Sequence, residues 1–295
     1  MASANPPATG DSPSQEPKVA AGSRARDALL RPFDTIGARA LELLDQCGGN
    51  VLLVLSAIRW VFRALTNRRV RLGRAAIVSQ IVRIGVRSIF IVSLVSGVVG
   101  LILALQLSPP LDEFGRRDLV ANIVGIAVLR ELGPLIGAIV LTGFAGAAIA
   151  AEIGTMVVSE EIEALEAHAL NPVRFLVVPR LLASVLSMTA LGVIASVTSI
   201  GCAIAISVTV LEIPYEQFMS NLLTQAKLTD FISGFVKGGV FGMLIGVIAC
   251  YNGLRVVGGA AGVGNATTST VVECVVAIIF ADLIFTMIFF AVGMV

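Results

Sequence analysis

The sequence predicts an all-α integral membrane protein with an N-terminal interfacial helix, five transmembrane helices, and a short cytoplasmic helix between the second and third spans. Two observations support this fold class. Hydrophobic residues make up 56% of the 295-residue chain and charged residues only 14%, with a mean hydropathy of +0.92, whereas soluble domains carry about 25% charged residues. The apolar residues also gather in runs of about 20 residues or more, the length at which a helix crosses a bilayer.

Composition divides the chain into three regions. Residues 1–30 are rich in Ala, Pro, Ser and charge and lack the apolar core of a signal peptide, which predicts a disordered cytoplasmic tail. Residues 31–83 form a basic region, and residues 84–295 form the transmembrane domain. Between Asp45 and Asp112 the chain has eight arginines and no acidic residue. The positive-inside rule therefore places this stretch and the N-terminus in the cytoplasm.

The basic region contains the predicted interfacial helix. Residues 50–65, "NVLLVLSAIRWVFRAL", are apolar but short for a span, and Arg59 and Arg63 lie one helical turn apart. A helix lying in the membrane surface accommodates this pattern, with Trp60 at the level of the headgroups and the arginines reaching water.

Hydropathy and length predict the five spans. The second is longer than a simple crossing, and Gly133 and Pro134 predict a break in it, because proline has no N–H for the carbonyl of Arg130. Five spans place the C-terminus on the outer side. Residues 258–265, "GGAAGVGN", are predicted to form an inner turn before the last span. The predicted spans are 84–107, 122–151, 175–210, 231–254 and 269–294.

Four charged residues stand well inside these spans, away from their ends: Arg130, Glu131, Lys237 and Asp282. A charge at the centre of a bilayer costs roughly 2.5 to 3.5 kcal/mol on insertion scales, so the four should face one another, water or a polar ligand. Two cations and two anions suggest pairing, for example of Glu131 with Lys237. The sequence leaves open whether the pairs only hold the bundle together or line a polar cavity.

A short acidic amphipathic helix is predicted after the second span. Ser159 is suited to cap it, and Asn171 and Pro172 end it. An acidic helix is repelled by anionic headgroups, so a basic protein surface is its expected partner, with a solvated loop helix as the alternative. The residues expected to make contact are Glu160, Glu161, Glu163, Leu165 and Glu166.

Several motifs are absent from the sequence. It contains no G-x-x-x-x-G-K-[ST] motif, so the chain is not expected to hydrolyse ATP through a P-loop. The four cysteines and one histidine show no metal-ligand spacing, and no common hydrolase motif occurs. We therefore expect no catalytic residue, no metal site, no cofactor in this chain and no nucleic-acid partner. Gly238, Gly242 and Gly246 form a stripe that favours close helix packing, within the chain or between subunits.

The segment "LRELGPLIGAIVLTGFAGAAIAAEIGTMVVSEEIEALEAHALNPVRFLVVPRLLA", with the later "GGAAGVGNATTSTVV", strongly resembles the MlaE family of permease subunits in Mce-associated lipid ABC transporters. The resemblance covers residues 50–295, so that residues 84–295 correspond to the permease domain. It implies a bacterial inner-membrane permease that pairs with a second copy or a paralogue. It also implies a separate P-loop ATPase that supplies ATP and Mg, and an Mce-domain (MlaD-like) protein on the outer side.

The resemblance also implies roles for the residues named above. The acidic helix would be the coupling helix that enters the ATPase, and the four intramembrane charges would line a cavity for a phospholipid or a related hydrophobic compound. Arg130 and Lys237 would contact phosphate, with Glu131 and Asp282 balancing the empty cavity. Two other classes remain open: an ion-coupled secondary transporter that uses the carboxylates, and a membrane scaffold in which the charges are structural.

Overall fold

The computed structural model describes residues 19–66 and 73–293, and within these ranges the chain is helical with no strand. Contacts divide the chain into two units, residues 1–49 and 50–295. Of the first unit, the structure describes the beginning of helix α1. The remaining helices, a 3₁₀ turn (η1) and three π turns (η2 to η4) belong to the second. The elements are α1 Val19–Thr66, α2 Arg74–Ile84, η1 Val86–Ser88, α3 Ile89–Glu113, α4 Leu119–Ala127, η2 Val128–Leu132, α5 Gly133–Leu141, η3 Thr142–Gly146, α6 Ala147–Val158, α7 Glu161–Ala167, η4 Val173–Val177, α8 Val178–Thr209, α9 Tyr215–Gln225, α10 Leu228–Leu254 and α11 Gly259–Ala291.

Six helical segments among the described residues are long and apolar enough to cross a membrane. Five of them correspond to the predicted spans, which confirms an all-α membrane protein. The sixth, Leu44–Ala64, contains the predicted interfacial helix. Length and composition do not separate a crossing helix from a surface helix, so the interfacial position stays a prediction. The other five segments are Arg74–Glu113, Leu119–Val158, Val173–Thr209, Leu228–Leu254 and Gly259–Ala291.

The N-terminal tail differs from its prediction in part. Helix α1 begins at Val19, so the described residues of the predicted 1–30 tail are helical, and residues 1–18 lie outside the described residues. Alanine, arginine and leucine are frequent after Val19, and these residues favour helix.

Two loop predictions are also corrected. The predicted inner turn at 258–265 is wrong, because α11 begins at Gly259 and only Gly258 and Gly259 adopt a left-handed conformation. The rest of that stretch is compatible with helix because its residues are small. The predicted spans 175–210 and 231–254 leave residues 211–230 as a loop, but this stretch contains helix α9, whose Phe218 and Leu222 are buried against α4.

The second membrane segment widens into a π turn at the predicted break and continues as helix beyond it. A π turn, η2 (Val128–Leu132), directly precedes Gly133 and Pro134. Because proline cannot donate to the carbonyl of Arg130, the helix accommodates an extra residue in this turn. Gly133 allows α8 to come close, since a Cβ at this position would lie 2.0 Å from Oγ of Ser196.

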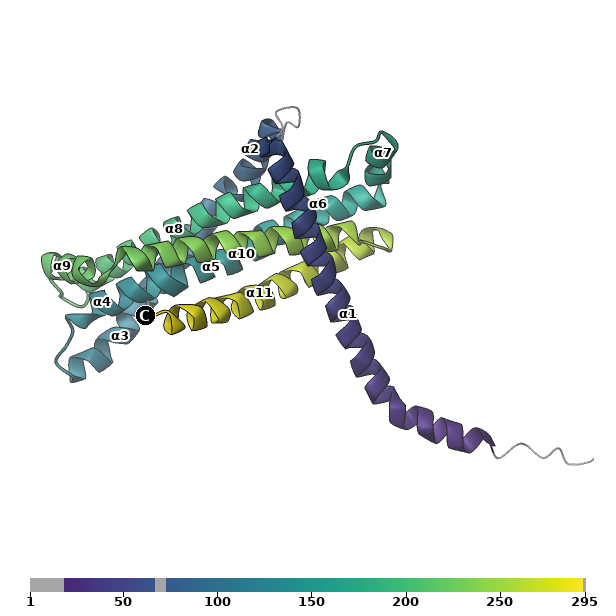
Figure 1. Cartoon of the computed structure of the whole chain (residues 1–295). Helices are drawn as coiled ribbons and strands as arrows, with labels where there is room; N and C mark the ends of the chain where they lie inside the picture. Colours follow the sequence, from purple (N-terminus) through teal and green to yellow (C-terminus); the bar gives the residue numbers. More distant parts are fainter. Residues whose placement is uncertain (1–18, 67–72, 294–295) are drawn as a thin grey trace, which may run out of the picture. The chain divides into compact units, whose positions relative to one another are not determined.

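Helix α8 is the centre of the bundle and packs on α3, α5 and α10. Figure 1 shows α8, α10, α5 and α11 running along one another, with α7 and α9 at opposite ends, which we call the α7 end and the α9 end. The predicted glycine stripe faces α8: a Cβ at Gly242 would lie 2.5 Å from the carbonyl oxygen of Ser184. The stripe therefore serves packing within the chain.

The part of α1 that belongs to the second unit packs on the α7 end of the bundle. Ala57 is fully buried in a cluster with Val178 and Leu181. The Trp60 ring lies 5.5 Å from the guanidinium carbon of Arg63 and 5.6 Å from that of Arg174. The contact with Arg174 joins α1 to η4, the segment that follows α7.

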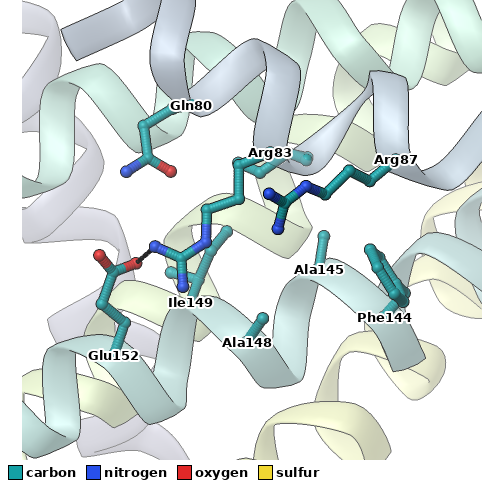
Figure 2. Close-up of a pocket in the computed structure, with 9 residues that line it drawn as sticks. Gln80, Arg83, Arg87, Phe144, Ala145, Ala148, Ile149 and Glu152 are labelled. Atoms are coloured by element: carbon teal, nitrogen blue, oxygen red, sulfur yellow. Dashed lines mark ion pairs between the residues drawn. The ribbon is translucent and has the colours of Figure 1, made fainter.

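A pocket of about 190 Å³ lies nearer the α7 end, between α2 with η1 on one side and α6 on the other. Figure 2 shows Arg83 and Arg87 reaching over α6, where Glu152 pairs with Arg83. Its floor is formed by Ala145, Ala148 and Ile149.

We predict that Gly100→Ala destabilises the protein, because a Cβ there would lie 2.0 Å from the carbonyl oxygen of Ser199 on α8 and backbone atoms cannot move aside without parting the helices. Gly201→Ala is the matched control, since nothing lies within 4 Å of its Cβ position. The thermal midpoint of the purified protein in detergent should fall by several degrees for Gly100→Ala only. Equal midpoints for the two variants would contradict the packing of α3 on α8.

Candidate functional site

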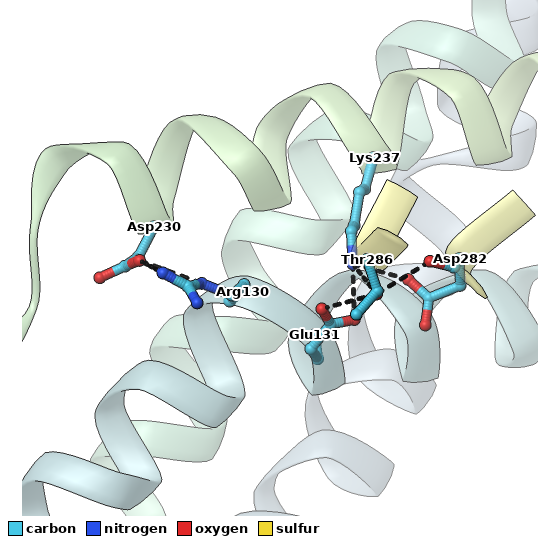
Figure 3. Close-up of polar contacts among 6 residues, drawn as sticks. All are labelled: Arg130, Glu131, Asp230, Lys237, Asp282 and Thr286. Atoms are coloured by element: carbon cyan, nitrogen blue, oxygen red, sulfur yellow. Dashed lines mark hydrogen bonds and ion pairs between the residues drawn. The ribbon is translucent and has the colours of Figure 1, made fainter. Parts of the chain in front are cut away.

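The intramembrane charges gather around one buried lysine. The Lys237 side chain is fully buried, and its Nζ donates to Oε2 of Glu131 at 2.5 Å and to Oδ1 of Asp282 at 2.8 Å. The Thr286 hydroxyl lies 3.1 Å from Oε1 of Glu131 and 2.9 Å from the carbonyl oxygen of Asp282. Figure 3 shows these four residues, the lysine cluster, pointing toward one another. The predicted contact between Glu131 and Lys237 is present.

Three different elements supply the lysine cluster. Glu131 is in the π turn η2, Lys237 in α10, and Asp282 and Thr286 in α11. Lys237 and Asp282 each lie nine residues from the end of their helix at the α9 end, or about 14 Å at 1.5 Å per residue. The cluster therefore lies inside the apolar bundle, within its α9 half.

Arg130 takes a separate partner, Asp230 at the start of α10. Nη2 and Nε of Arg130 donate to Oδ1 of Asp230 at 2.6 and 3.1 Å, and Oδ2 of Asp230 accepts the backbone N–H of Lys227 at 3.1 Å. Asp230 is buried. The adjacent residues Arg130 and Glu131 thus bind different partners, Asp230 and Lys237, as Figure 3 shows.

Sequence reasoning missed Asp230. It falls at the boundary of the predicted fourth span, in the first turn of α10, where an acidic residue is expected to stabilise the helix N-terminus. The four predicted charges balanced one another, so nothing in the sequence indicated a further acid; Arg130 needs one because Lys237 takes both Glu131 and Asp282.

The lysine cluster carries one positive and two negative groups when all are ionised. It is also partly open, because the side chains of Glu131 and Asp282 are 28% and 16% exposed while Lys237 is inaccessible. A ligand that reaches the cluster from the surface of this chain would therefore meet the carboxylates first. The arrangement can hold a charged group or exchange partners.

The acidic helix α7 lies at the opposite end of the bundle and is shorter than predicted. It spans Glu161–Ala167, and the prediction that Ser159 caps it is wrong. Helix α6 continues to Val158, and the Ser159 hydroxyl donates back to the carbonyl of Thr155 at 2.9 Å. Leu165 is partly buried, and the acidic contact candidates are exposed: Glu160, Glu161, Glu163 and Glu166.

Fold and charges together define a multi-pass membrane protein with an ionic cluster between its helices. The family model "Permease MlaE" matches residues 77–288. A probable ABC transporter permease protein of Rickettsia bellii is 33% identical over 264 residues, covering 90% of this chain and all of the relative. The chain belongs to the MlaE permease family, as the sequence motifs predicted.

Two further relatives come from photosynthetic organisms. The Arabidopsis thaliana protein TRIGALACTOSYLDIACYLGLYCEROL 1, chloroplastic, is 34% identical over 211 residues, which cover 72% of this chain and 60% of that protein. A probable ABC transporter permease protein of Synechocystis sp. is 32% identical over 212 residues, covering 72% of this chain and 81% of the relative.

We predict that Lys237→Met lowers stability, because it leaves Glu131 and Asp282 facing each other without a cation. Removing one partner of a buried ion pair costs about 3 to 5 kcal/mol, and the partial exposure of the carboxylates places this case at the lower end. The thermal midpoint in detergent should fall by several degrees, and adding Glu131→Gln and Asp282→Asn should restore part of the loss. Lys227→Met, at an exposed side chain, is the control. If the thermal midpoint did not recover in the triple variant, the unpaired carboxylate charges would not be the cause of the destabilisation.

Proposed function

We propose that this chain is the transmembrane permease subunit of an ATP-driven ABC transporter that moves phospholipid, or a related hydrophobic compound, between the inner membrane and an Mce-domain carrier. The observation that carries the proposal is the partly open lysine cluster between the membrane-spanning helices of an MlaE-family permease. A phospholipid has a charged headgroup on apolar tails, and such a cluster surrounded by apolar helices offers a place for both.

The geometry refines the expected roles of the four charges. Arg130 and Lys237 are already bound to carboxylates, so a phosphate must compete with Asp230 or with Glu131 and Asp282 for them. An exchange of partners of this kind distinguishes an empty state from a loaded one, because the ligand favours the arrangement in which the cations are released to it. The carboxylates then hold the cations in place while the site is empty.

Support for a lipid cargo comes from the relatives. The Arabidopsis protein carries the name of a glycerolipid, and the Rickettsia and Synechocystis proteins are named as probable ABC transporter permeases. A partner ATPase would bind ATP and Mg in this reading, and a second permease copy or a paralogue would complete the assembly. The N-terminus would be cytoplasmic and the C-terminus on the outer side.

The exposed acidic helix α7 is proposed to contact the ATPase. Its glutamates present negative charge at one end of the bundle, and a basic groove on the ATPase would complement them. Leu165, partly buried, would orient the helix on the permease or insert at the contact. Since α7 follows directly on the second membrane segment, a movement of α7 would be passed along the helix that carries Glu131.

We predict that the assembled complex transfers lipid between liposomes and the carrier protein in an ATP-dependent way, and that Glu131→Gln, Lys237→Met and Asp282→Asn each reduce the rate at least about tenfold. The loss is expected because each change removes a charged hydrogen bond, typically worth about 1.5 to 3 kcal/mol. Fluorescent-lipid transfer with purified complex is the measurement, and Lys227→Met is the control. Unchanged transfer after neutralising Arg130, Glu131, Lys237 and Asp282 one at a time would refute the ionic cavity.

We predict that reversing the charge of α7, with Glu161→Lys and Glu163→Lys, releases the ATPase while the permease still folds. Pull-down of the ATPase subunit measures the contact, and the thermal midpoint of the permease shows whether the variant still folds. Glu216→Lys, at an exposed position on α9 at the other end of the bundle, is the control. If the ATPase stays bound to the α7 variant, the contact lies elsewhere.

The excess of carboxylates over cations in the lysine cluster favours one alternative, an ion-coupled transporter in which Glu131 and Asp282 carry protons. That function predicts transport that stops when the proton gradient is collapsed and continues without ATP. The proposed ABC transporter predicts the reverse in the same vesicles. A scaffold predicts no transport in either condition.

A further inference from the structure

The pocket near the α7 end collects more positive than negative charge. Glu152 is shared by two guanidinium groups, at 2.8 Å from Nη1 of Arg83 and 3.1 Å from Nη2 of Arg180. Arg87 also lines the pocket, and the part of the chain that the structure describes offers it no ion-pair partner. One carboxylate among three arginines leaves two positive charges without a counterion in this region.

A polar group in the pocket also lacks a partner. Oε1 of Gln80 is buried and accepts no hydrogen bond from any described residue, and Nε of the buried Arg180 beside the pocket donates none. Buried polar atoms without partners are uncommon in native structures. The Gln80 amide belongs to the pocket lining together with Arg83 and Arg87, so a ligand with both donors and acceptors would satisfy this set.

The remaining wall of the pocket is apolar and lies within membrane-spanning segments. Phe144 is 47% exposed, and Ala148 and Ile149 continue the apolar surface below the arginines. Arg83 and Arg87 belong to the segment Arg74–Glu113, and the other wall belongs to the segment Leu119–Val158. A ligand that fits both sides of the pocket has a phosphate to bind the two guanidinium groups and a hydrocarbon chain to contact the apolar side.

We infer that this pocket binds the phosphate of a membrane phospholipid at the α7 end, with Arg83 and Arg87 as the two phosphate ligands. Two guanidiniums four residues apart offer several N–H donors to one phosphate, an arrangement that arginine makes well. Glu152, which also lines the pocket, has a positioning role, since its ion pair holds Arg83 over the pocket.

This pocket is distinct from the lysine cluster. Glu152 and Glu131 lie 21 residues apart along the same membrane segment, which corresponds to about 30 Å. The inference does not depend on the proposed transport, because binding is measured on the permease alone without ATPase or carrier.

The test is native mass spectrometry of the purified full chain, titrated with dioleoylphosphatidic acid or with dioleoylglycerol, which lacks only the phosphate. Arg87→Gln should weaken phosphatidic acid binding roughly tenfold or more and leave dioleoylglycerol unchanged, because it removes a charge-assisted contact. Arg87→Lys should keep a larger share of the binding. Arg74→Gln is the matched control: Arg74 is exposed on the same membrane segment and does not line the pocket.

Several outcomes would overturn the inference. Equal phosphatidic acid binding by Arg87→Gln and Arg74→Gln would remove the pocket as the site. Full competition by glycerol 3-phosphate would identify a soluble phosphate ester as the ligand instead of a lipid. If Arg87→Gln lost the dimer signal but kept phosphatidic acid binding, the pocket would be assigned to contact with a second copy of the chain. Loss of phosphatidic acid binding in Lys237→Met but not in Arg87→Gln would place the measured lipid at the lysine cluster, where the proposed function puts its cargo, and would overturn this inference alone.

Discussion

The ion pairs of the Lys237 ammonium group with Glu131 and Asp282 are the interaction on which the arrangement of the bundle depends. The ammonium group is completely buried, and a bare charge there would be costly in a medium with few polar groups. Glu131 and Asp282 satisfy it from two other elements, so η2 and α11 must approach α10 at this depth. Arg130 is bound in turn to Asp230, in the first turn of α10. The two ionic contacts, supplied by adjacent residues, fix the second membrane segment against α10 along more than one turn.

Close helix packing makes this ionic arrangement possible. The carbonyl oxygen of Leu129 lies only 2.2 Å from where a Cβ at position 234 would be, and Gly133 similarly admits Ser196. These glycines bring α10 and α8 onto the π turn that holds Glu131. Side chains of ordinary size there would move Lys237 away from its carboxylates, so the small residues serve the ionic site as well as the packing of the bundle.

The features that could be predicted from sequence are those with a large energetic penalty attached. Apolar length gave the membrane segments, and the cost of intramembrane charge led directly to the contact between Glu131 and Lys237. Asp230 was not paired with Arg130 because its position at a span boundary carried no comparable penalty. Helix α9 was missed since its amphipathic sequence reads as a polar loop until α4 supplies a surface for Phe218 and Leu222. The start of α11 was missed because the glycines and alanines of residues 258–265 are compatible both with a turn and with a close-packed helix.

The π turn η3, Thr142–Gly146, separates Glu131 from Glu152 on one membrane segment. A π turn holds one residue more than an α turn, and each residue of an α-helix advances the chain by about 100° around the axis. If η3 relaxed to α geometry, the parts of the segment on either side would turn against each other by about that angle. Glu131 would then face a different helix while Glu152 kept its position, or the reverse. The rotation of one end of this segment relative to the other is therefore set by five uncharged residues, and a single-residue deletion among them would change it.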